Sequence, residues 1–403
     1  MTSLWWPGDQ HAGDLVSDTA LLRALVRVEQ AWLDALVAAG VAPAGAAHDL
    51  TGLVGDDDAE RVAVEAEAGG NPVIPLVALL RDRAPEPATT WLHRGLTSQD
   101  VVDTAVLLCA RDAVARVRRE LGRQVDRLAD LVDRHRATPM LARTLTQPAV
   151  PTTFGAKAAT WLHGILDADD ALGALAWPVQ LGGAAGTLAA IVELGGPDRT
   201  RAARTAYAAA LGLAEAPPWH TRRAPVTRLA DAAVGATDAW GRIANDVLVL
   251  GRPEIGELAD GSGGGSSTMP HKANPTTATL VRRAALAAPQ LAATLHLAAA
   301  EQVDERADGA WHVEWATLAV LLRRTVVAAV QATRLLDDLQ VHGERMRSHL
   351  AAAGDAVLAE QRSMAGLAGH DPAPTYHGLL DDLADEALAR AAVHRHDRKA
   401  DDA

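Results

Sequence analysis

The chain has 403 residues, of which 49% are hydrophobic and only 3% aromatic, and its formal net charge is −13. This acidic balance argues against nucleic acid and against anionic membranes as partners, because both attract basic surfaces. The single cysteine, Cys109, excludes an internal disulfide and a cysteine-based metal cluster.

The sequence carries no recognisable targeting or membrane segment. Residues 1–13 contain neither a basic n-region nor an apolar h-region. No stretch reaches the roughly 18 uncharged apolar residues that a membrane-spanning helix needs. We therefore expect a soluble, cytoplasmic protein whose large core consists mainly of Ala, Leu and Val.

The first long helix is expected between residues 104 and 136. Its apolar residues recur every three or four positions, with Arg and Asp on the opposite face; they are Val114, Val117, Leu121, Val125, Leu128 and Val132. We expect Thr97 or Ser98 to cap its start and Pro139 to end it.

Three more long helices are expected farther along the chain, at residues 226–250, 276–300 and about 311–339. Strand-type alternation of apolar and polar residues is nearly absent. Helices of this length with almost no strands predict an all-α protein built around a bundle of near-parallel helices.

Clusters of proline and glycine mark the boundaries between segments. Pro85-Glu86-Pro87 closes an N-terminal helical segment, and the long helices stop near residue 345. We therefore expect three helical domains: an N-terminal domain (1–110), a central long-helix bundle (111–345) and a short C-terminal domain (346–403). His394 and His396 should be exposed to solvent, and the chain from residue 395 onward should be frayed.

Residues 261–275 are the most informative segment. A Gly/Ser-rich stretch precedes two hydroxyl groups, Ser266 and Ser267, and Lys272 and Asn274 follow. Lys and Asn each occur only three times in the whole sequence, yet one of each lies here. The segment is either a plain connector between helices or a mobile loop that closes on a substrate. A phosphate-binding loop is excluded, because the Gly-x-x-x-x-Gly-Lys-Ser/Thr spacing and a preceding strand are absent.

Three other clusters combine hydroxyl, amide and basic side chains. His93-Arg94-Gly95-Leu96-Thr97-Ser98-Gln99-Asp100 precedes the first long helix, and its hydroxyl groups either cap that helix or help to bind a carboxylate. Residues 143–155 open another helix, which Thr152 or Thr153 would cap. Trp219-His220-Thr221-Arg222-Arg223 carries two guanidinium groups, which are either solvated or bind an anion.

Several of these motifs together suggest a family. The longest is Gly265-Ser266-Ser267-Thr268-Met269-Pro270-His271-Lys272-Ala273-Asn274-Pro275. The others are His93-x-Gly95-x-Thr97-Ser98-Gln99-Asp100, Pro151-Thr152-Thr153-Phe154-Gly155, Pro178-Val179-Gln180-Leu181-Gly182-Gly183, Pro218-Trp219-His220-Thr221 and Trp311-His312-x-Glu314-Trp315. With them the chain, over roughly residues 1–350, resembles the fumarase/aspartase superfamily and within it the 3-carboxy-cis,cis-muconate cycloisomerase branch.

The resemblance implies an all-α homotetramer in which three subunits build each active site, a small polycarboxylate substrate and no cofactor. It implies that Ser266 is the catalytic base, with Lys272 as the second catalytic residue. We assign substrate binding to His93, Thr97, Ser98, Gln99, Thr144, Gln147, Arg223, Met269 and Asn274. We expect no metal, because His312 and Glu314 lie on different faces of a helix.

Leu145 bears on the reaction type. Lyases of this superfamily usually have a histidine at this position, where it serves as the general acid that expels an amine or alkoxide. A carboxylate leaves as a stable anion and needs no such acid. We therefore expect the lactonisation of 3-carboxy-cis,cis-muconate to 4-carboxymuconolactone, a step of protocatechuate degradation.

Two alternatives to the cycloisomerase stay open. A lyase that eliminates another stable anion, such as nitrite from nitrosuccinate, follows from the same argument, whereas an adenylosuccinate-type lyase is disfavoured by Leu145. Pro148 and Ala224 depart from the pattern of the family, and they motivate a hypothesis of another class, a non-catalytic helical scaffold.

Overall fold

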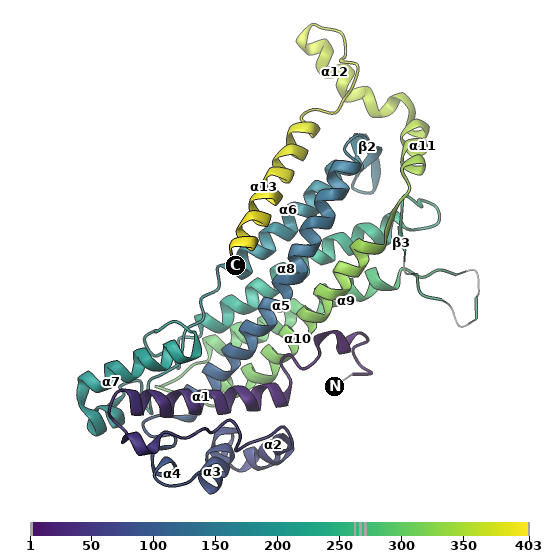
Figure 1. Cartoon of the computed structure of the whole chain (residues 1–403). Coiled ribbons are helices and arrows are strands. Elements are labelled where there is room, and N and C mark those ends of the chain that lie inside the picture. The colour runs from purple at the N-terminus through teal and green to yellow at the C-terminus, as the bar shows by residue number, and fades with distance from the viewer. Residues whose placement is uncertain (1–2, 262, 266–267, 270–271, 402–403) are drawn as a thin grey trace. The chain divides into compact units, whose positions relative to one another are not determined.

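The computed structural model describes residues 3–261, 263–265, 268–269 and 272–401 (Figure 1). The helices of eight or more residues in these ranges are α1 (Asp18–Ala38), α2 (Asp58–Gly69), α3 (Val73–Arg83), α5 (Ser98–Arg134), α6 (Phe154–Gly173), α7 (Ala189–Leu211), α8 (Ala224–Leu250), α9 (Thr276–Ala300), α10 (Gly309–Asp338), α11 (Gly343–Ala353), α12 (Ala359–Ala368) and α13 (Leu380–Asp401). A short helix, α4, spans Ala88–Trp91. The predicted all-α class is confirmed.

The four long helices lie close to where the periodicity predicted them. The first, α5, begins at Ser98 directly after Thr97 and ends five residues before Pro139. Asp100, in its first turn, accepts the backbone N–H of Thr97 at 3.0 Å, one half of a capping box. No helix within the described residues combines the length and the apolarity that a bilayer crossing would require.

The chain is divided into two compact units. The first comprises the described parts of Met1–Arg116, Ala174–Ala233 and Pro289–Val326, and the second those of Val117–Gly173, Val234–Ala288 and Val327–Ala403. Helices α5, α8, α9 and α10 each contribute residues to both units. Each unit combines segments that are separated in the sequence. The three domains that we expect from the proline and glycine clusters are consecutive segments, so they divide the chain differently.

In the first unit, α1 runs along α7 (Figure 1). The indole of Trp32 on α1 meets the ring of Tyr207 on α7 edge to face, with 5.5 Å between the ring centroids. Both side chains are fully buried, together with leucines such as Leu25, Leu36 and Leu76. This core supports the turn at residues 92–97, because the indole N–H of Trp32 donates to the carbonyl of Arg94 at 2.7 Å.

In the second unit, a buried amide joins three helices. Gln124 of α5 donates to the hydroxyl of Thr333 and to the carbonyl of Ala329, both on α10 and both at 3.0 Å. Its carbonyl oxygen accepts the indole N–H of Trp240 on α8 at 2.7 Å. The amide is fully satisfied, as a buried polar group must be, so it fixes the register of these helices.

Two antiparallel strands precede α6 and were not predicted. The strands β1 (Pro139–Thr144) and β2 (Gln147–Thr153) pair around a two-residue turn. Pro148 and Pro151 lie in β2, where prolines mask the alternation that marks a strand in sequence. The predicted cap is confirmed for Thr153, whose hydroxyl accepts the N–H of Ala156 at 3.1 Å. Two further short strands, β3 (Leu258–Asp260) and β4 (Leu339–Val341), also pair antiparallel.

The C-terminal segment differs from the prediction. Helix α13 continues to Asp401 and lies against α6 (Figure 1), so the expected fraying from residue 395 is wrong for residues 395–401. His394 is also not solvent-exposed, because its Nε2 lies 3.0 Å from Oδ2 of the buried Asp169. Arg395 donates to Asp126 at 2.6 Å. His396 is exposed, as predicted.

Candidate active site

The candidate residues fall into two groups, one in each unit. The first unit carries His93, Thr97, Ser98, Gln99 and Arg223, and the second carries Thr144, Gln147, Met269, Lys272 and Asn274. Ser266, the expected base, and its neighbour Ser267 lie outside the described residues.

His93 contacts a buried carboxylate of α1. Its Nδ1 lies 2.6 Å from Oε1 of Glu29, whose side chain has no exposed surface. Burial by itself lowers the pKa of His93, but the Glu29 carboxylate more than compensates, so the net pKa is raised. The Glu29 carboxylate therefore favours the charged form of the imidazole, which is suited to binding an anion.

The start of α5 presents two hydroxyl groups and one basic side chain. Thr97 is 7% exposed, and its hydroxyl accepts a hydrogen bond from the guanidinium of Arg306. Ser98, the first helical residue, is half-buried. Both lie beside free backbone N–H groups of a helix N-terminus, which favours negative charge. Arg306 is itself exposed, and its sequence position alone did not mark it as a member of this group.

Gln99 and Arg223, for which substrate binding was expected, are both buried. Gln99 is fully buried, and its amide donates to the carbonyl of His220 at 2.8 Å and to Asp103 at 3.2 Å. Arg223 is 3% exposed. Its Nη1 donates to Asp103 Oδ2 at 2.8 Å and its Nε to Glu314 Oε1 at 3.0 Å, so two edges of the guanidinium already bind carboxylates. Both residues thus make buried polar contacts within the first unit.

The burial of this ion cluster shifts the pKa values within it. Burial raises the pKa of Glu314 and outweighs the opposing effect of Arg223. For Arg223, burial acts to lower the pKa, but Asp103 and Glu314 reverse the direction and raise it. Of the two alternatives for this arginine pair, solvation applies to Arg222, which is exposed, and not to the buried Arg223.

In the second unit, the β1–β2 turn places Thr144, Leu145, Thr146 and Gln147 on the surface. The side chain of Leu145 is 96% exposed. The hairpin is anchored close to this turn, because Arg143 donates to both carboxylate oxygens of Glu257, at 3.0 and 2.7 Å. Burial acts to raise the pKa of Glu257, but its bonds from Arg143 and His349 lower it on balance. Arg143 thus fixes the hairpin next to its turn, and the side chains of the turn are exposed.

The Gly/Ser-rich loop is closed at its base. Gly264 and Asn274 exchange two backbone hydrogen bonds, each of 2.8 Å. A side chain at Gly264 would meet the hydroxyl of Thr276 within 2.1 Å, so glycine is required there. Asn274 also donates to the carbonyl of Gly265 at 3.5 Å, and the side chains of Met269 and Lys272 are exposed. Lys272 and Asn274 therefore flank the end of the loop that leads into α9.

Asp100 joins three of the motifs in the first unit. Its carboxylate accepts the backbone N–H groups of Gly182 and Gly183, each at 2.9 Å, and Nε2 of His220 lies at the same distance. Asp100 is the last residue of the motif at 93–100. Neither its residue type nor its position in that motif predicts that it joins three motifs. Its partners lie far away along the chain, so their convergence could be seen only in the fold.

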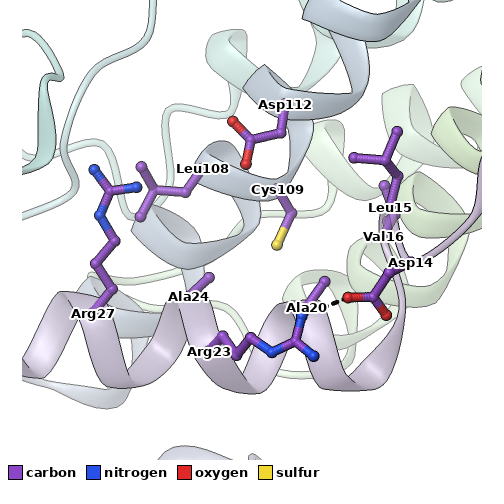
Figure 2. A pocket seen from close by; sticks show the side chains of 10 residues that line it. All are labelled: Asp14, Leu15, Val16, Ala20, Arg23, Ala24, Arg27, Leu108, Cys109 and Asp112. Atoms are coloured by element: carbon purple, nitrogen blue, oxygen red, sulfur yellow. Dashed lines mark hydrogen bonds and ion pairs between the residues drawn. The ribbon is translucent and has the colours of Figure 1, made fainter. Parts of the chain in front are cut away.

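A separate cavity of about 330 Å³ lies in the first unit, between α1 and α5 (Figure 2). Among its lining residues, Arg23 donates to Asp14 at 2.6 Å and to Asp56 at 2.7 Å. Burial raises the pKa of the Cys109 thiol to about 12, so it stays protonated and unreactive. None of the candidate residues lines this cavity. Within the described residues, no cluster of three or more potential ligands could hold a metal ion.

Comparison with known proteins identifies the family. Residues 23–289 match the protein family described as lyase. The chain belongs to this lyase family, within the fumarase/aspartase superfamily. It is therefore a member of a family of enzymes, and the resemblance noted in the sequence is confirmed.

Two of the relatives of this lyase-family chain are named for different activities. It is 40% identical over 401 residues to nitrosuccinate lyase of Streptomyces davaonensis, which covers 96% of this chain and 81% of the relative. It is 37% identical over 383 residues to 3-carboxy-cis,cis-muconate cycloisomerase of Bradyrhizobium diazoefficiens, covering 92% and 84%. The crystal structure of the 3-carboxy-cis,cis-muconate lactonizing enzyme of Pseudomonas putida superposes with a TM-score of 0.81 at 30% identity, covering 95% of this chain and 86% of that one.

Proposed function

We propose that the protein is a cycloisomerase that converts 3-carboxy-cis,cis-muconate to 4-carboxymuconolactone. A carboxylate of the substrate adds to the conjugated alkene, and a proton is delivered to the carbon next to another carboxylate. The observation that carries the proposal is the composition of the β1–β2 turn. From Thr144 to Thr153 the hairpin contains no titratable side chain, and Leu145 in its turn is 96% exposed.

The absence of an acid on this hairpin restricts the leaving group. In the reverse direction, lactone opening releases a carboxylate, which is stable near neutral pH without protonation. Release of an amine or alkoxide would require a general acid, which Leu145 cannot supply. The cycloisomerase relative at 37% identity supports this assignment of substrate.

The intermediate of such a reaction is an aci-carboxylate with two negative charges. Preorganised donors are the main means of stabilising it. Lys272, Asn274 and the N-terminus of α9 would supply them from the loop, and His93, Thr97 and Ser98 would bind the other carboxylates. Ser266 would transfer the proton, because a positive, dehydrated site stabilises its alkoxide.

Nitrite elimination from nitrosuccinate is the second candidate function. Nitrite is also a stable anion, so the argument from Leu145 applies equally, and a nitrosuccinate lyase is among the relatives at 40% identity. An adenylosuccinate-type lyase is disfavoured by the same residue. A scaffold without activity is disfavoured by the complete motif at residues 265–275.

We further propose that the protein works as a cytoplasmic homotetramer with active sites shared among three subunits. The proposal rests on the family and on the distribution of the candidate residues over several separate segments. Sedimentation of the purified protein would test the tetramer, and a monomer that is fully active would contradict it.

A substrate panel tests the function. The purified protein is assayed with 3-carboxy-cis,cis-muconate, nitrosuccinate and adenylosuccinate, and the first is expected to have the highest kcat/KM. Ser266→Ala should lower turnover at least about 100-fold while substrate still binds, consistent with loss of a general acid or base. Ser267→Ala is the matched control; an equal loss in this variant would reject Ser266 as the base. A higher kcat/KM for nitrosuccinate would instead assign nitrite elimination as the function.

A further inference from the structure

Glu29 is a buried carboxylate in the middle of α1 to which neither the sequence motifs nor the proposed function gives a role. Its side chain has no exposed surface, and its Oε1 lies 2.6 Å from Nδ1 of His93. Its second oxygen, Oε2, is buried and has no hydrogen-bond partner among the described residues. Burying a carboxylate with one oxygen unpaired costs folding free energy. We expect such a group where its hydrogen-bond partner, here His93, depends on it.

The backbone around His93 is also held in an unusual conformation. His93 has φ 61° and Gly95 has φ 82°, both in the left-handed region, which is uncommon for a residue other than glycine. Helix α1 constrains this segment twice, through Glu29 and through the bond from Trp32 to the carbonyl of Arg94. The imidazole is thus fixed at both its backbone and its Nδ1.

We propose that Glu29 is the positioning residue of His93, which it holds with Nδ1 protonated so that Nε2 is available to a carboxylate of the substrate. The inference rests on the proposed function in that His93 binds a substrate carboxylate. The hydrogen bond at one ring nitrogen determines the state of the other, and a carboxylate at Nδ1 also stabilises the charged ring. Glu29 itself does not touch the substrate.

Three charged groups determine the charge of His93. Glu29 on α1 and Asp100 on α5 favour the imidazolium, whereas Arg81 on α3 and burial oppose it. Removal of the Glu29 charge leaves burial and Arg81 opposed by the weaker effect of Asp100. The ring should then become neutral at a lower pH, and it should bind an anion more weakly.

The variant Glu29→Gln, which keeps the shape of the side chain, tests the proposal. Histidine labelled with ¹⁵N reports the titration of His93 in the full-length protein, and tricarballylate serves as a polycarboxylate probe in calorimetry. We expect the pKa of His93 above its ordinary 6.5 in the wild type and below it in the variant. We expect tricarballylate to bind about 10-fold more weakly or worse, with its pH dependence displaced to lower pH.

Kinetics separate positioning from a structural role. Glu29→Gln should raise KM about 10-fold while kcat changes less than about threefold, because the carboxylate contact is present in the ground state as well. In a His93→Gln background the same change should have no further effect on tricarballylate affinity. Asp34→Asn is the control, since Asp34 is exposed on the same helix; it should leave all of these values unchanged.

Two results would overturn the proposal. One is an unaltered His93 titration in Glu29→Gln, and the other is additive loss of affinity in the double variant. Should Glu29→Gln fail to fold, the ¹⁵N shifts of wild-type His93 at high pH decide, because protonation at Nε2 rather than Nδ1 would also reject it. These readouts need no turnover, so they remain decisive even if the substrate panel rejects the cycloisomerase.

Discussion

Nε2 of His220 lies 2.9 Å from Oδ1 of Asp100, although the two residues are 120 positions apart in the sequence. The same carboxylate also accepts the amide of Gln180 at 3.2 Å. Because Gln180 and His220 belong to two of the motifs that indicated the superfamily, those motifs specify the interior that supports the site. The residues of these motifs are therefore not all substrate contacts.

This convergence predicts that Asp100→Asn is strongly destabilising. The amide keeps the shape of the side chain, but it removes the charge that Gly182, Gly183 and His220 share. We expect the free energy of unfolding to fall by about 3–5 kcal/mol, because a neutral amide cannot accept all of these buried hydrogen bonds, and hydrogen bonds to a charged group are worth about 1.5–3 kcal/mol each. Urea denaturation measures the change. Asp112→Asn, at an exposed position of the same helix, should stay within about 0.5 kcal/mol.

Arg223 and Arg222 form a second matched pair. Arg223→Met leaves Asp103 and Glu314 buried without a cation and should cost about 3–5 kcal/mol of unfolding free energy. Arg223→Lys keeps the charge but cannot span both carboxylates, so a smaller loss of roughly 1–3 kcal/mol is expected. Arg222→Met should be nearly neutral, because Arg222 is exposed. Equal effects at the two positions, measured by urea denaturation, would refute the assigned role of the buried cluster.

The helices could be predicted because their signal is local. The third long helix was expected at residues 276–300 and spans Thr276–Ala300. The β1–β2 hairpin could not be predicted, since the two prolines of β2 hide the alternation and its register depends on a partner strand. A fixed pattern of three to four residues is visible in any window of sequence, whereas strand pairing is not.

The candidate site was predictable to a similar extent. His93, Thr97 and Arg223 stand out by residue type, but Glu29 lies 64 positions from His93, and Asp103 lies 120 positions from Arg223. Which carboxylate approaches which cation is decided by tertiary packing. The sequence therefore predicted the cations and hydroxyl groups but not the buried acids that orient them.

The tip of the hairpin is strained, and this predicts a trade-off between stability and activity. Leu145 and Thr146 have φ 48° and 70°, a conformation for which Asn-Gly is the favoured pair. The double change Leu145→Asn with Thr146→Gly should raise the free energy of unfolding by about 1 kcal/mol, because strained positions of this kind cost about 1–3 kcal/mol each. Thermal unfolding checks this gain.

The same double variant tests whether the tip belongs to the site. If Thr144 and Gln147 bind substrate, the change of loop between them should lower kcat/KM several-fold even as stability rises. A control change at Thr152, near the other end of β2, should affect neither quantity strongly. Unchanged kcat/KM in the double variant would place the tip outside the site.

The attachment of α13 gives a prediction that depends on pH. His394 and Arg118 bind the buried Asp169 at 3.0 and 2.9 Å. Burial acts to raise the pKa of Asp169, but these two bonds lower it overall, below its ordinary 3.8. A carboxyl group with a depressed pKa in the folded state stabilises the protein at pH values above its unfolded pKa, and this contribution is lost as the pH falls through the folded value.

His394→Ala should therefore loosen α13 at neutral pH, where Asp169 is charged. Removal of one charge-assisted hydrogen bond is worth about 1.5–3 kcal/mol. Hydrogen exchange should show lower protection in residues 380–398 while that of α8 is unchanged, since the effect is confined to the contact with α6. His396→Ala, at the exposed position two residues later, should not alter protection. The difference between the two variants should shrink at acid pH once Asp169 is protonated, and a difference independent of pH would mean that His394 acts through packing instead of through this carboxylate.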